Sequence, residues 1–226
     1  MEFLVTMTTH VPEGTSEETV AEVRAREAEN SARLAEQRRL LRLWRPPLGP
    51  GEWRSIGLFT AADADDLERT LAAMPLRIWR TDEVTALAPH PNDPWAGAQR
   101  ERSGGSRSGE SPSDESRGEV EFLTEFRVTP PQRTDEAAWE TYQQADAQEA
   151  ESAAALARQG HLIRLWKPEQ APTRPGPGVS LVLGLWRAAD ADVVASIVES
   201  LPLDPWMTVG VTPLTTHPSD PGHNTP

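Results

Sequence analysis

Two stretches of the chain share one alternating pattern of apolar and polar side chains. Residues 40–46, with the sequence LLRLWRP, recur in the second half of the chain as residues 162–168, LIRLWKP. Such alternation is typical of a half-buried strand. Because the flanking segments also recur in the same order, the sequence predicts two copies of one unit.

The hydrophobic pattern predicts the element order βαββαβ in each copy. In the first copy the expected strands are 3–8, 40–46, 53–60 and 78–87, and the expected helices are 17–39 and 62–73. In the second copy the expected strands are 120–128, 162–167, 180–186 and 206–214, and the expected helices are 136–159 and 190–200. This order predicts the α+β class, as two tandem ferredoxin-like domains with antiparallel sheets and two helices on one face.

A polar segment separates the two copies. Residues 96–118 are rich in Gly, Ser and charged side chains and hold no aliphatic side chain larger than alanine, so we expect a flexible linker between domains 1–95 and 119–226. Trp44 and Trp166 are expected on the sheet face that the helices leave bare, and such a face needs a cover. We therefore expect the copies to pack as an intrachain pseudo-dimer, like a dimeric α+β barrel, from which higher homo-oligomers can be built.

The composition of the chain excludes several classes of binding partner and site. The formal net charge is −13, and both halves are acidic, which argues against nucleic acid or an anionic membrane as the main partner. The absence of cysteine excludes disulfides, thiolate metal sites and Cys nucleophiles. Because the chain lacks a membrane-length apolar run, a Gly-rich phosphate loop and metal-ligand spacing, we expect a cytoplasmic protein that uses a small-molecule substrate and no metal or cofactor.

A carboxylate interrupts the apolar stripe of each long helix. The stripes comprise Val20, Val23, Glu27, Asn30 and Leu34 in the first copy and Tyr142, Ala145, Glu149, Ser152 and Leu156 in the second. A carboxyl group with an apolar surround has a raised pKa and suits general-base work, which makes Glu27 and Glu149 candidate catalytic residues. The competing interpretation is a helix rotated so that both lie at a solvated edge. Glu29 and Glu151 fall on the outer face, where a solvated charge is expected.

Strand 40–46 and its repeat supply candidate substrate-binding residues, namely Arg42, Trp44, Arg45, Arg164, Trp166 and Lys167. Arg42 and Arg45 point to opposite faces of a strand, so one of them faces the helices. Arg45 and Lys167 share their face with Leu41, Leu43, Ile163 and Leu165, which favours the helix-covered side for that pair. A bidentate clamp on a carboxylate requires Arg, so Lys167 indicates a weaker or altered second site. The alternative is a surface charge that ends the strand.

Several motifs together resemble the muconolactone isomerases, a family of small enzymes of aromatic catabolism. They are Glu27-x-Glu29 and Glu149-x-Glu151, Leu43-Trp44-Arg45 and Leu165-Trp166-Lys167, a Leu-Pro-Leu type turn at 74–76 and 201–203, and a closing His-Pro at His90 and His217. The resemblance implies a ferredoxin-like fold, oligomeric assembly and a carbon–carbon double-bond shift in a lactone. The sequence departs from the family at strand three, around Ser55-Ile56-Gly57, and at Ala28 and Ala150, where the family often carries Lys.

The sequence therefore favours a cofactor-independent isomerase that shifts a double bond in a small, muconolactone-like lactone by Glu-mediated proton transfer. Two alternatives stay open. One is an isomerase or cyclase of specialised metabolism acting on another carbonyl substrate. The other is a non-catalytic protein that binds small ligands or mediates assembly. His90 and His217 are expected to be turn residues rather than catalysts.

Overall fold

The computed structural model describes residues 1–95, 120–169 and 178–223. The predicted linker, residues 96–118, lies outside the described residues. The first repeat comprises β1 (Glu2–Thr9), α1 (Glu17–Glu36), β2 (Leu40–Arg45), β3 (Arg54–Thr60), α2 (Ala64–Ala72), η1 (Pro75–Trp79) and β4 (Arg80–Pro89). The second comprises β5 (Val120–Val128), α4 (Glu136–Arg158), β6 (Leu162–Pro168), β7 (Ser180–Ala188), α5 (Ala191–Glu199), η2 (Asp204–Trp206), β8 (Met207–Thr216) and η3 (Pro221–His223).

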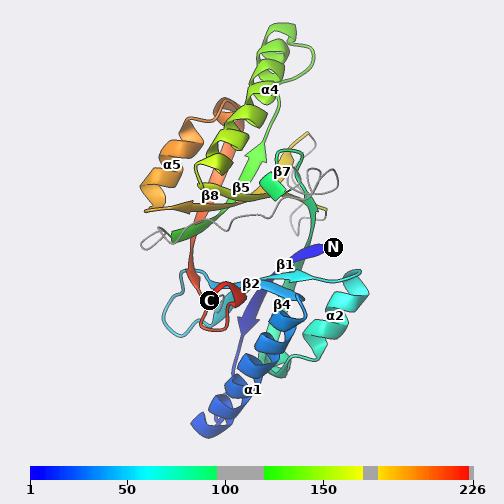
Figure 1. Ribbon diagram of the computed structural model, residues 1–226, viewed down its shortest axis with the longest axis vertical. Coiled ribbons are helices and arrows are strands. Elements are labelled where there is room, and N and C mark those ends of the chain that lie inside the picture. Colours follow the sequence, from blue (N-terminus) through cyan, green and yellow to red (C-terminus); the bar gives the residue numbers. More distant parts are fainter. Residues whose placement is uncertain (96–119, 170–177, 224–226) are drawn as a thin grey trace, which may run out of the picture. The chain divides into compact units, whose positions relative to one another are not determined.

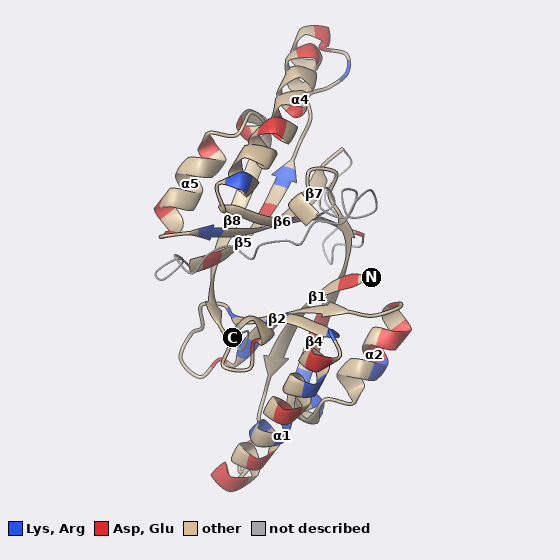
Figure 2. Ribbon diagram, viewed as in Figure 1, with Lys and Arg blue, Asp and Glu red and all other residues tan. Residues whose placement is uncertain are grey.

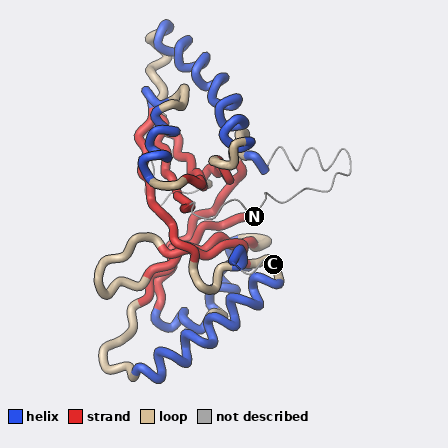
Figure 3. Tube along the Cα trace, turned by 60° about the vertical axis from the view of Figure 1, so that its left-hand side comes forward, coloured by secondary structure: helices blue, strands red, loops and turns tan. Residues whose placement is uncertain are grey.

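Both repeats have the predicted βαββαβ order, and the α+β class is confirmed. The strands are ordered β4–β1–β3–β2 in the first repeat and β8–β5–β7–β6 in the second, and the pairs with a determined register are antiparallel. The last strand of each repeat begins later than expected because a 3-10 turn opened by Pro75 or Asp204 precedes it. In each repeat two helices lie against one face of the strands (Figures 1 and 3).

The helix-facing side of each sheet carries the core. In the first repeat Leu34 of α1 and Leu67 and Leu71 of α2 pack with strand residues that include Phe3, Val5, Met7, Leu40, Leu43 and Phe59. The second repeat uses Ala153, Val194 and Val198 against Phe122, Phe126, Leu162, Leu165 and Trp186. Side-chain caps fix the helix starts: Ser16 for α1 and Asp135 for α4.

A β-bulge alters the predicted parity of β2. The register shifts between Leu40, opposite Phe59, and Arg42, opposite Leu58. Leu40 and Leu43 therefore both join the core, at 1% and 5% exposure, and the prediction that Leu41 shares the face of Leu43 was wrong. The same shift occurs in β6, so Leu162 rather than Ile163 accompanies Leu165. A bulge inserts one residue, which reverses the alternation on one side of it.

Glycine in β3 and β7 leaves room for an aromatic ring. A Cβ on Gly57 would lie 2.4 Å from the ring of Phe59, and a Cβ on Gly184 would lie 2.5 Å from Nε1 of Trp186. Both rings are buried. Trp186 donates a hydrogen bond from Nε1 to Oγ1 of Thr124, at 2.8 Å. Glycine at these two positions thus leaves space for a flat aromatic ring on the helix-facing side.

The compact units of the structure differ from the sequence repeats. Unit 1 comprises Met1–Leu87 and Leu214–Pro226, and unit 2 comprises Ala88–Pro213. The reason is hydrogen bonding: the amide of His217 donates to the carbonyl of Leu43 at 3.0 Å, and the amide of His90 donates to the carbonyl of Leu165 at 3.1 Å. Each repeat thus contributes its closing segment to the unit built mainly from the other repeat, whereas the predicted domains, 1–95 and 119–226, keep each repeat whole.

A buried aspartate anchors each exchanged segment. Asp220 accepts the amide hydrogen of Leu43 at 2.5 Å and pairs with Arg42 at 3.3 Å. Asp93 accepts the amide hydrogen of Leu165 at 3.0 Å and pairs with Arg164 at 3.3 Å. Both side chains are at most 3% exposed, and buried polar groups of this kind are stabilised by such hydrogen bonds and ion pairs. Within the described residues, none of the helices has the length and apolar character that crossing a membrane requires.

Candidate active sites

Each unit contains a cavity between its long helix and its sheet. Cavity 1, in unit 1, has a volume of about 300 Å³, and cavity 2, in unit 2, has a volume of about 410 Å³. Cavity 1 is lined by polar side chains that include Thr9, Arg24, Glu27, Ser31, Arg45, Trp53, Ser55, Arg80 and His217. The corresponding wall of cavity 2 includes Val128, Asp146, Glu149, Ala153, Lys167, Ser180, Val182, Met207 and His90.

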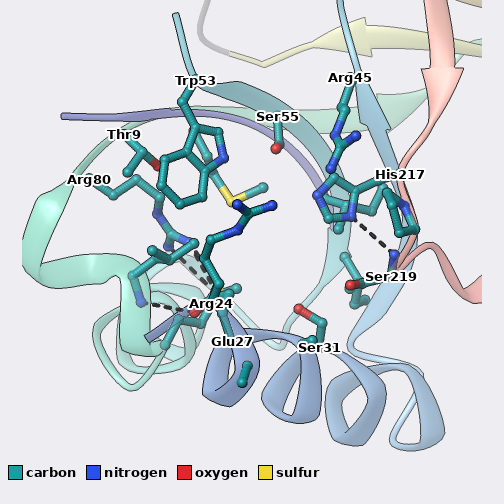
Figure 4. Close-up of a pocket in the computed structure, with 18 of the residues that line it drawn as sticks. Thr9, Arg24, Glu27, Ser31, Arg45, Trp53, Ser55, Arg80, His217 and Ser219 are labelled. Atoms are coloured by element: carbon teal, nitrogen blue, oxygen red, sulfur yellow. Dashed lines mark hydrogen bonds and ion pairs between the residues drawn. The ribbon is translucent and has the colours of Figure 1, made fainter. Parts of the chain in front are cut away.

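Glu27 lies on the wall of cavity 1 that α1 provides (Figure 4). The neighbouring buried residues Val23 and Leu34 hold this face of the helix against the sheet, which leaves the Glu27 side chain 12% exposed. The amide of Leu76 donates to Oε2 of Glu27 at 2.9 Å. Burial raises the pKa of Glu27, and the Leu76 hydrogen bond and the charge of Arg80 oppose this effect. Its raised pKa makes Glu27 a stronger base than an exposed glutamate.

The Leu-Pro-Leu type motif acquires a role from this geometry. Pro75 opens the 3-10 turn η1 and has no amide hydrogen, so the amide of Leu76 is the donor that reaches Glu27. In the second repeat the amide of Leu203 donates to Oε2 of Glu149 at 3.1 Å. The motif thus holds one oxygen, Oε2, of each of the two carboxyl groups.

Charged side chains of η1 and β4 form ion pairs next to Glu27. Nη1 of Arg80 lies 3.3 Å from Oε1 of Glu27, and Nε of Arg80 lies 2.6 Å from Oδ1 of Asp82. Arg77 in turn contacts Asp82 at 2.9 Å. The side chains of Arg80 and Asp82 are each 2% exposed. Asp82 thus fixes the guanidinium group of Arg80 beside Glu27 and compensates the positive charge of that group.

His217 reaches cavity 1 from the exchanged segment. The amide of Ser219 donates to Nδ1 of His217 at 3.1 Å, so the neutral ring carries its hydrogen on Nε2. Burial, followed by the charges of Arg45 and Arg24, lowers the pKa of His217 to about 4. The imidazole is therefore neutral at pH 7 and offers Nε2–H as a hydrogen-bond donor.

Two further arginines give cavity 1 a positive character. Arg45 lines the cavity from β2, and Arg24 lines it from α1 with its guanidinium carbon 5.3 Å from the ring centre of Trp53. In Figure 4, Arg45 lies beside His217, and Arg24 extends from α1 toward Trp53. Three arginines and one glutamate thus line cavity 1, which suits an anionic ligand.

Cavity 2 keeps the carboxyl group and changes its surroundings. Burial raises the pKa of Glu149, and the negative charge of Asp146 raises it further. Asp146 stands where the first repeat has Arg24, and Met207 stands where it has Arg80. Among the described residues that line cavity 2, Lys167 is the single cation. Figure 2 shows the same contrast along the helices, since α1 carries both charge types and α4 is mainly acidic.

The structure brings some of the predicted site residues together and not others. Glu27 and Arg45 line cavity 1, and Glu149 and Lys167 line cavity 2. Glu29 and Glu151 are exposed on the outer helix faces, as predicted. The other four predicted binding residues, Arg42, Trp44, Arg164 and Trp166, lie outside both cavity linings.

Those four residues have a different environment. Trp44 and Trp166 are each 1% exposed. The guanidinium carbon of Arg42 stacks on Trp44, at 4.9 Å from the ring centre, and that of Arg164 stacks on Trp166, at 4.8 Å. Because the same arginines pair with the anchoring aspartates, these side chains hold the exchanged segments in place.

Sequence reasoning missed the β4 pair and the cavity histidines. Arg80 and Asp82 are two residues apart on a strand and therefore share a face, which is a signal that the sequence contains. His217 could not be assigned to the first unit from local pattern, because it belongs to the second repeat. Within the described residues no three His, Asp or Glu side chains gather as metal ligands.

Two comparisons place these observations among known proteins. Each unit is an antiparallel α+β fold with a cavity between helix and sheet. A family model described as muconolactone delta-isomerase matches residues 1–93 and again residues 120–220. The chain belongs to the muconolactone delta-isomerase family, as two tandem copies. This confirms the resemblance inferred from the sequence motifs. A search of curated protein sequences gave no match.

Solved structures resemble the chain in fold. Two mutants of chlorite dismutase from Candidatus Nitrospira defluvii each have 12% sequence identity and cover 96% of this chain and 92% of their own, with TM-scores of 0.54 and 0.53. An anthrone oxidase-like protein has 10% identity and covers 96% of this chain and 91% of its own, with a TM-score of 0.43. At these identities the likeness concerns the fold alone.

Proposed function

We propose that unit 1 is a cofactor-independent isomerase that shifts the double bond of a small unsaturated lactone bearing a carboxylate. The observation that carries the proposal is the buried carboxyl group of Glu27, which faces a cavity of about 300 Å³ together with three arginines. Membership of the muconolactone delta-isomerase family supports the same reaction class.

Glu27 serves as the proton shuttle in this proposal. Its carboxylate removes the proton from the γ carbon of the lactone, and the electron pair of that bond moves through the ring to the carbonyl oxygen as a dienolate forms. The protonated Glu27 then returns the proton to the α carbon, and the double bond takes its new position. No atoms are gained or lost, so one group that accepts and returns a proton is sufficient.

Neutral and cationic donors stabilise the charges of this reaction. Nε2–H of His217 is available to the oxygen that becomes negative in the dienolate, and a neutral donor keeps its hydrogen when the charge develops. Arg24 and Arg45 are assigned to the carboxylate of the substrate. The charge of Arg80 opposes the rise in the pKa of Glu27 and so favours its ionised, basic form.

Glu149 is the equivalent candidate base of unit 2. The Leu203 amide holds it as the Leu76 amide holds Glu27, but cavity 2 presents one lysine where cavity 1 presents three arginines. We assign turnover of the carboxylate-bearing lactone to unit 1. The finer fold prediction, two ferredoxin-like repeats packed as a pseudo-dimer, belongs to the same proposal and is supported by the exchange of the closing segments.

Proton NMR with the full chain tests the reaction. Muconolactone incubated with the protein in D₂O is expected to convert to its enol-lactone isomer and to incorporate deuterium at the α carbon. Neither conversion nor deuterium incorporation at any carbon, with protein whose fold is verified by circular dichroism, would refute the proposal.

A further inference from the structure

Four polar positions of cavity 1 are apolar in cavity 2. Thr9, Ser31, Ser55 and Arg80 correspond to Val128, Ala153, Val182 and Met207. Asp82, which compensates Arg80, corresponds to Val209. Both members of the buried ion pair of unit 1 thus correspond to apolar side chains in unit 2, so neither charge is present there without the other.

The charges that remain in cavity 2 disfavour an anion. Lys167 faces two acidic residues, Asp146 and Glu149, whereas the three arginines of cavity 1 face one. Asp146 replaces the positive charge of Arg24 by a negative charge at the same helical position. A ligand carboxylate that entered cavity 2 would lose water and meet the negative charge of Asp146 where cavity 1 offers the positive charge of Arg24.

Cavity 2 is larger than cavity 1 and has aromatic side chains in its wall. Its volume of about 410 Å³ exceeds the volume of about 300 Å³ in cavity 1. Trp186, held by its hydrogen bond to Thr124, and Phe126 pack with ring centres 6.2 Å apart and line the wall. Tyr142 adds a phenol at the position of Val20 and packs edge-on against Trp206, at 5.4 Å.

Donors and acceptors are retained within this apolar wall. The amide of Asn92 donates to Nδ1 of His90 at 3.2 Å, so the neutral His90 ring carries its hydrogen on Nε2. Tyr142 supplies a hydroxyl group and Glu149 a carboxyl group. A pocket with apolar walls and a few convergent polar groups is the usual form of a site for a small uncharged molecule.

We propose that cavity 2 is a separate binding site for an uncharged, largely apolar carbonyl compound, and that it discriminates against carboxylates. The carbonyl oxygen accepts the hydrogen bond of His90, and the ring of the ligand lies against Trp186 and Phe126. This site does not depend on the reaction proposed for unit 1, because none of its lining residues belongs to unit 1.

Site-resolved fluorine NMR on the full chain tests this proposal. Protein labelled with 5-fluorotryptophan carries one reporter in cavity 1, Trp53, and one in cavity 2, Trp186. The two resonances are assigned with Trp53→Phe and Trp186→Phe, the second of which places Phe where the first repeat has Phe59. The probes are coumarin, an uncharged unsaturated lactone, and coumarin-3-carboxylate, which has the same rings and a negative charge.

Coumarin is expected to shift the Trp186 resonance saturably, with a Kd at least tenfold lower than that of coumarin-3-carboxylate. Asp146→Arg, which reproduces Arg24 on an exposed position, is expected to reduce this preference at least threefold. Glu140→Arg makes the same charge change on α4 outside the cavity lining and serves as the matched control. Met207→Arg/Val209→Asp is a second variant that restores the buried pair and is expected to act in the same direction.

Three results would overturn the proposal. They are the absence of a saturable coumarin shift at Trp186, equal or tighter binding of the carboxylate there, and an equal effect of Asp146→Arg and Glu140→Arg. The test is separable from the isomerase assay, because lactone turnover and the Trp53 resonance report on unit 1 and the Trp186 resonance reports on unit 2.

Discussion

Cavities 1 and 2 have the same backbone scaffold and the same carboxyl group, but their electrostatic surroundings differ. Glu27 and Glu149 each accept a hydrogen bond from the amide that follows the turn proline, and burial raises the pKa of both. Arg80 then opposes the shift at Glu27, whereas Asp146 adds to the shift at Glu149. A duplicated site can therefore keep its carboxyl group while the charges around that group change.

The largest expected effect separates the two carboxyl groups. Glu27→Gln preserves the shape of the side chain and removes the base, so it should lower the rate of isomerisation of a carboxylate-bearing lactone by roughly 10²–10⁴-fold. Glu149→Gln is the matched control and should leave that rate unchanged. Steady-state kinetics of the two variants measure this difference, and a greater loss in the Glu149 variant would reverse the assignment.

The buried pair on β4 is the next largest difference. Arg80→Met leaves Asp82 buried with Arg77 as its remaining cation among the contacts described, and should destabilise the protein by about 3 kcal/mol. Arg80→Met/Asp82→Val reproduces Met207 and Val209 and should recover most of that loss. Urea unfolding of the three proteins is the measurement. Equal stability of the single and double variants would show that the pair is not coupled.

The same variants predict a change in pH dependence. A base must be ionised, so kcat/KM falls as the pH drops through the pKa of Glu27. The charge of Arg80 lowers that pKa and the charge of Asp82 raises it by less. Arg80→Met should therefore move the acidic limb of the pH profile to higher pH, and the double variant should move it by a smaller amount.

The carboxyl group that the two cavities share was predictable from the sequence. The periodicities of Val23, Glu27 and Leu34 and of Ala145, Glu149 and Leu156 placed both carboxyl groups on the inward helix faces, because an α-helix returns to the same side every three to four residues. Glu27 and Glu149 do line the cavities. The bulge in β2 was not predictable, since one inserted residue leaves no distinctive composition.

The exchange of closing segments lay beyond sequence reasoning for a physical reason. The segment that begins at His217 can form the same hydrogen bonds with the strand around Leu43 as with the strand around Leu165, because LLRLWRP and LIRLWKP are nearly the same strand. Local pattern cannot choose between two equivalent partners. For that reason His217 was assigned to a turn of the second domain rather than to cavity 1.

The anchoring aspartates give a smaller and more local prediction. Asp220→Asn removes the ion pair with Arg42 and weakens the hydrogen bond from Leu43, which should cost roughly 1.5–3 kcal/mol. Because His217 lies on the same segment, this variant should raise KM for the reaction of unit 1. Asp93→Asn should cost a similar amount of stability and should affect ligand binding in cavity 2 instead. An equal change of KM in both variants would contradict the assignment of one closing segment to each cavity.

The smallest expected effect concerns the two histidines. Burial and neighbouring cations lower the pKa of both His90 and His217 to about 4, so neither ring should take up a proton between pH 8 and 5. Long-range proton–nitrogen NMR should show both rings in the Nε2–H form. Arg45→Met should raise the pKa of His217, and Lys167→Met should raise that of His90, because each removes a nearby positive charge. If Arg45→Met changed the pKa of His90, or Lys167→Met that of His217, the closing segments would not be exchanged.

The division of the chain into units also has a consequence for how the protein is synthesised. Unit 2 is continuous in sequence, from Ala88 to Pro213, whereas unit 1 needs Leu214 and the residues that follow it. During translation, unit 2 can be completed while cavity 1 still lacks His217 and Ser219. A chain that ends within the second repeat therefore lacks the residues that complete the pocket around Glu27, so the activity proposed for unit 1 would require translation beyond Ser219.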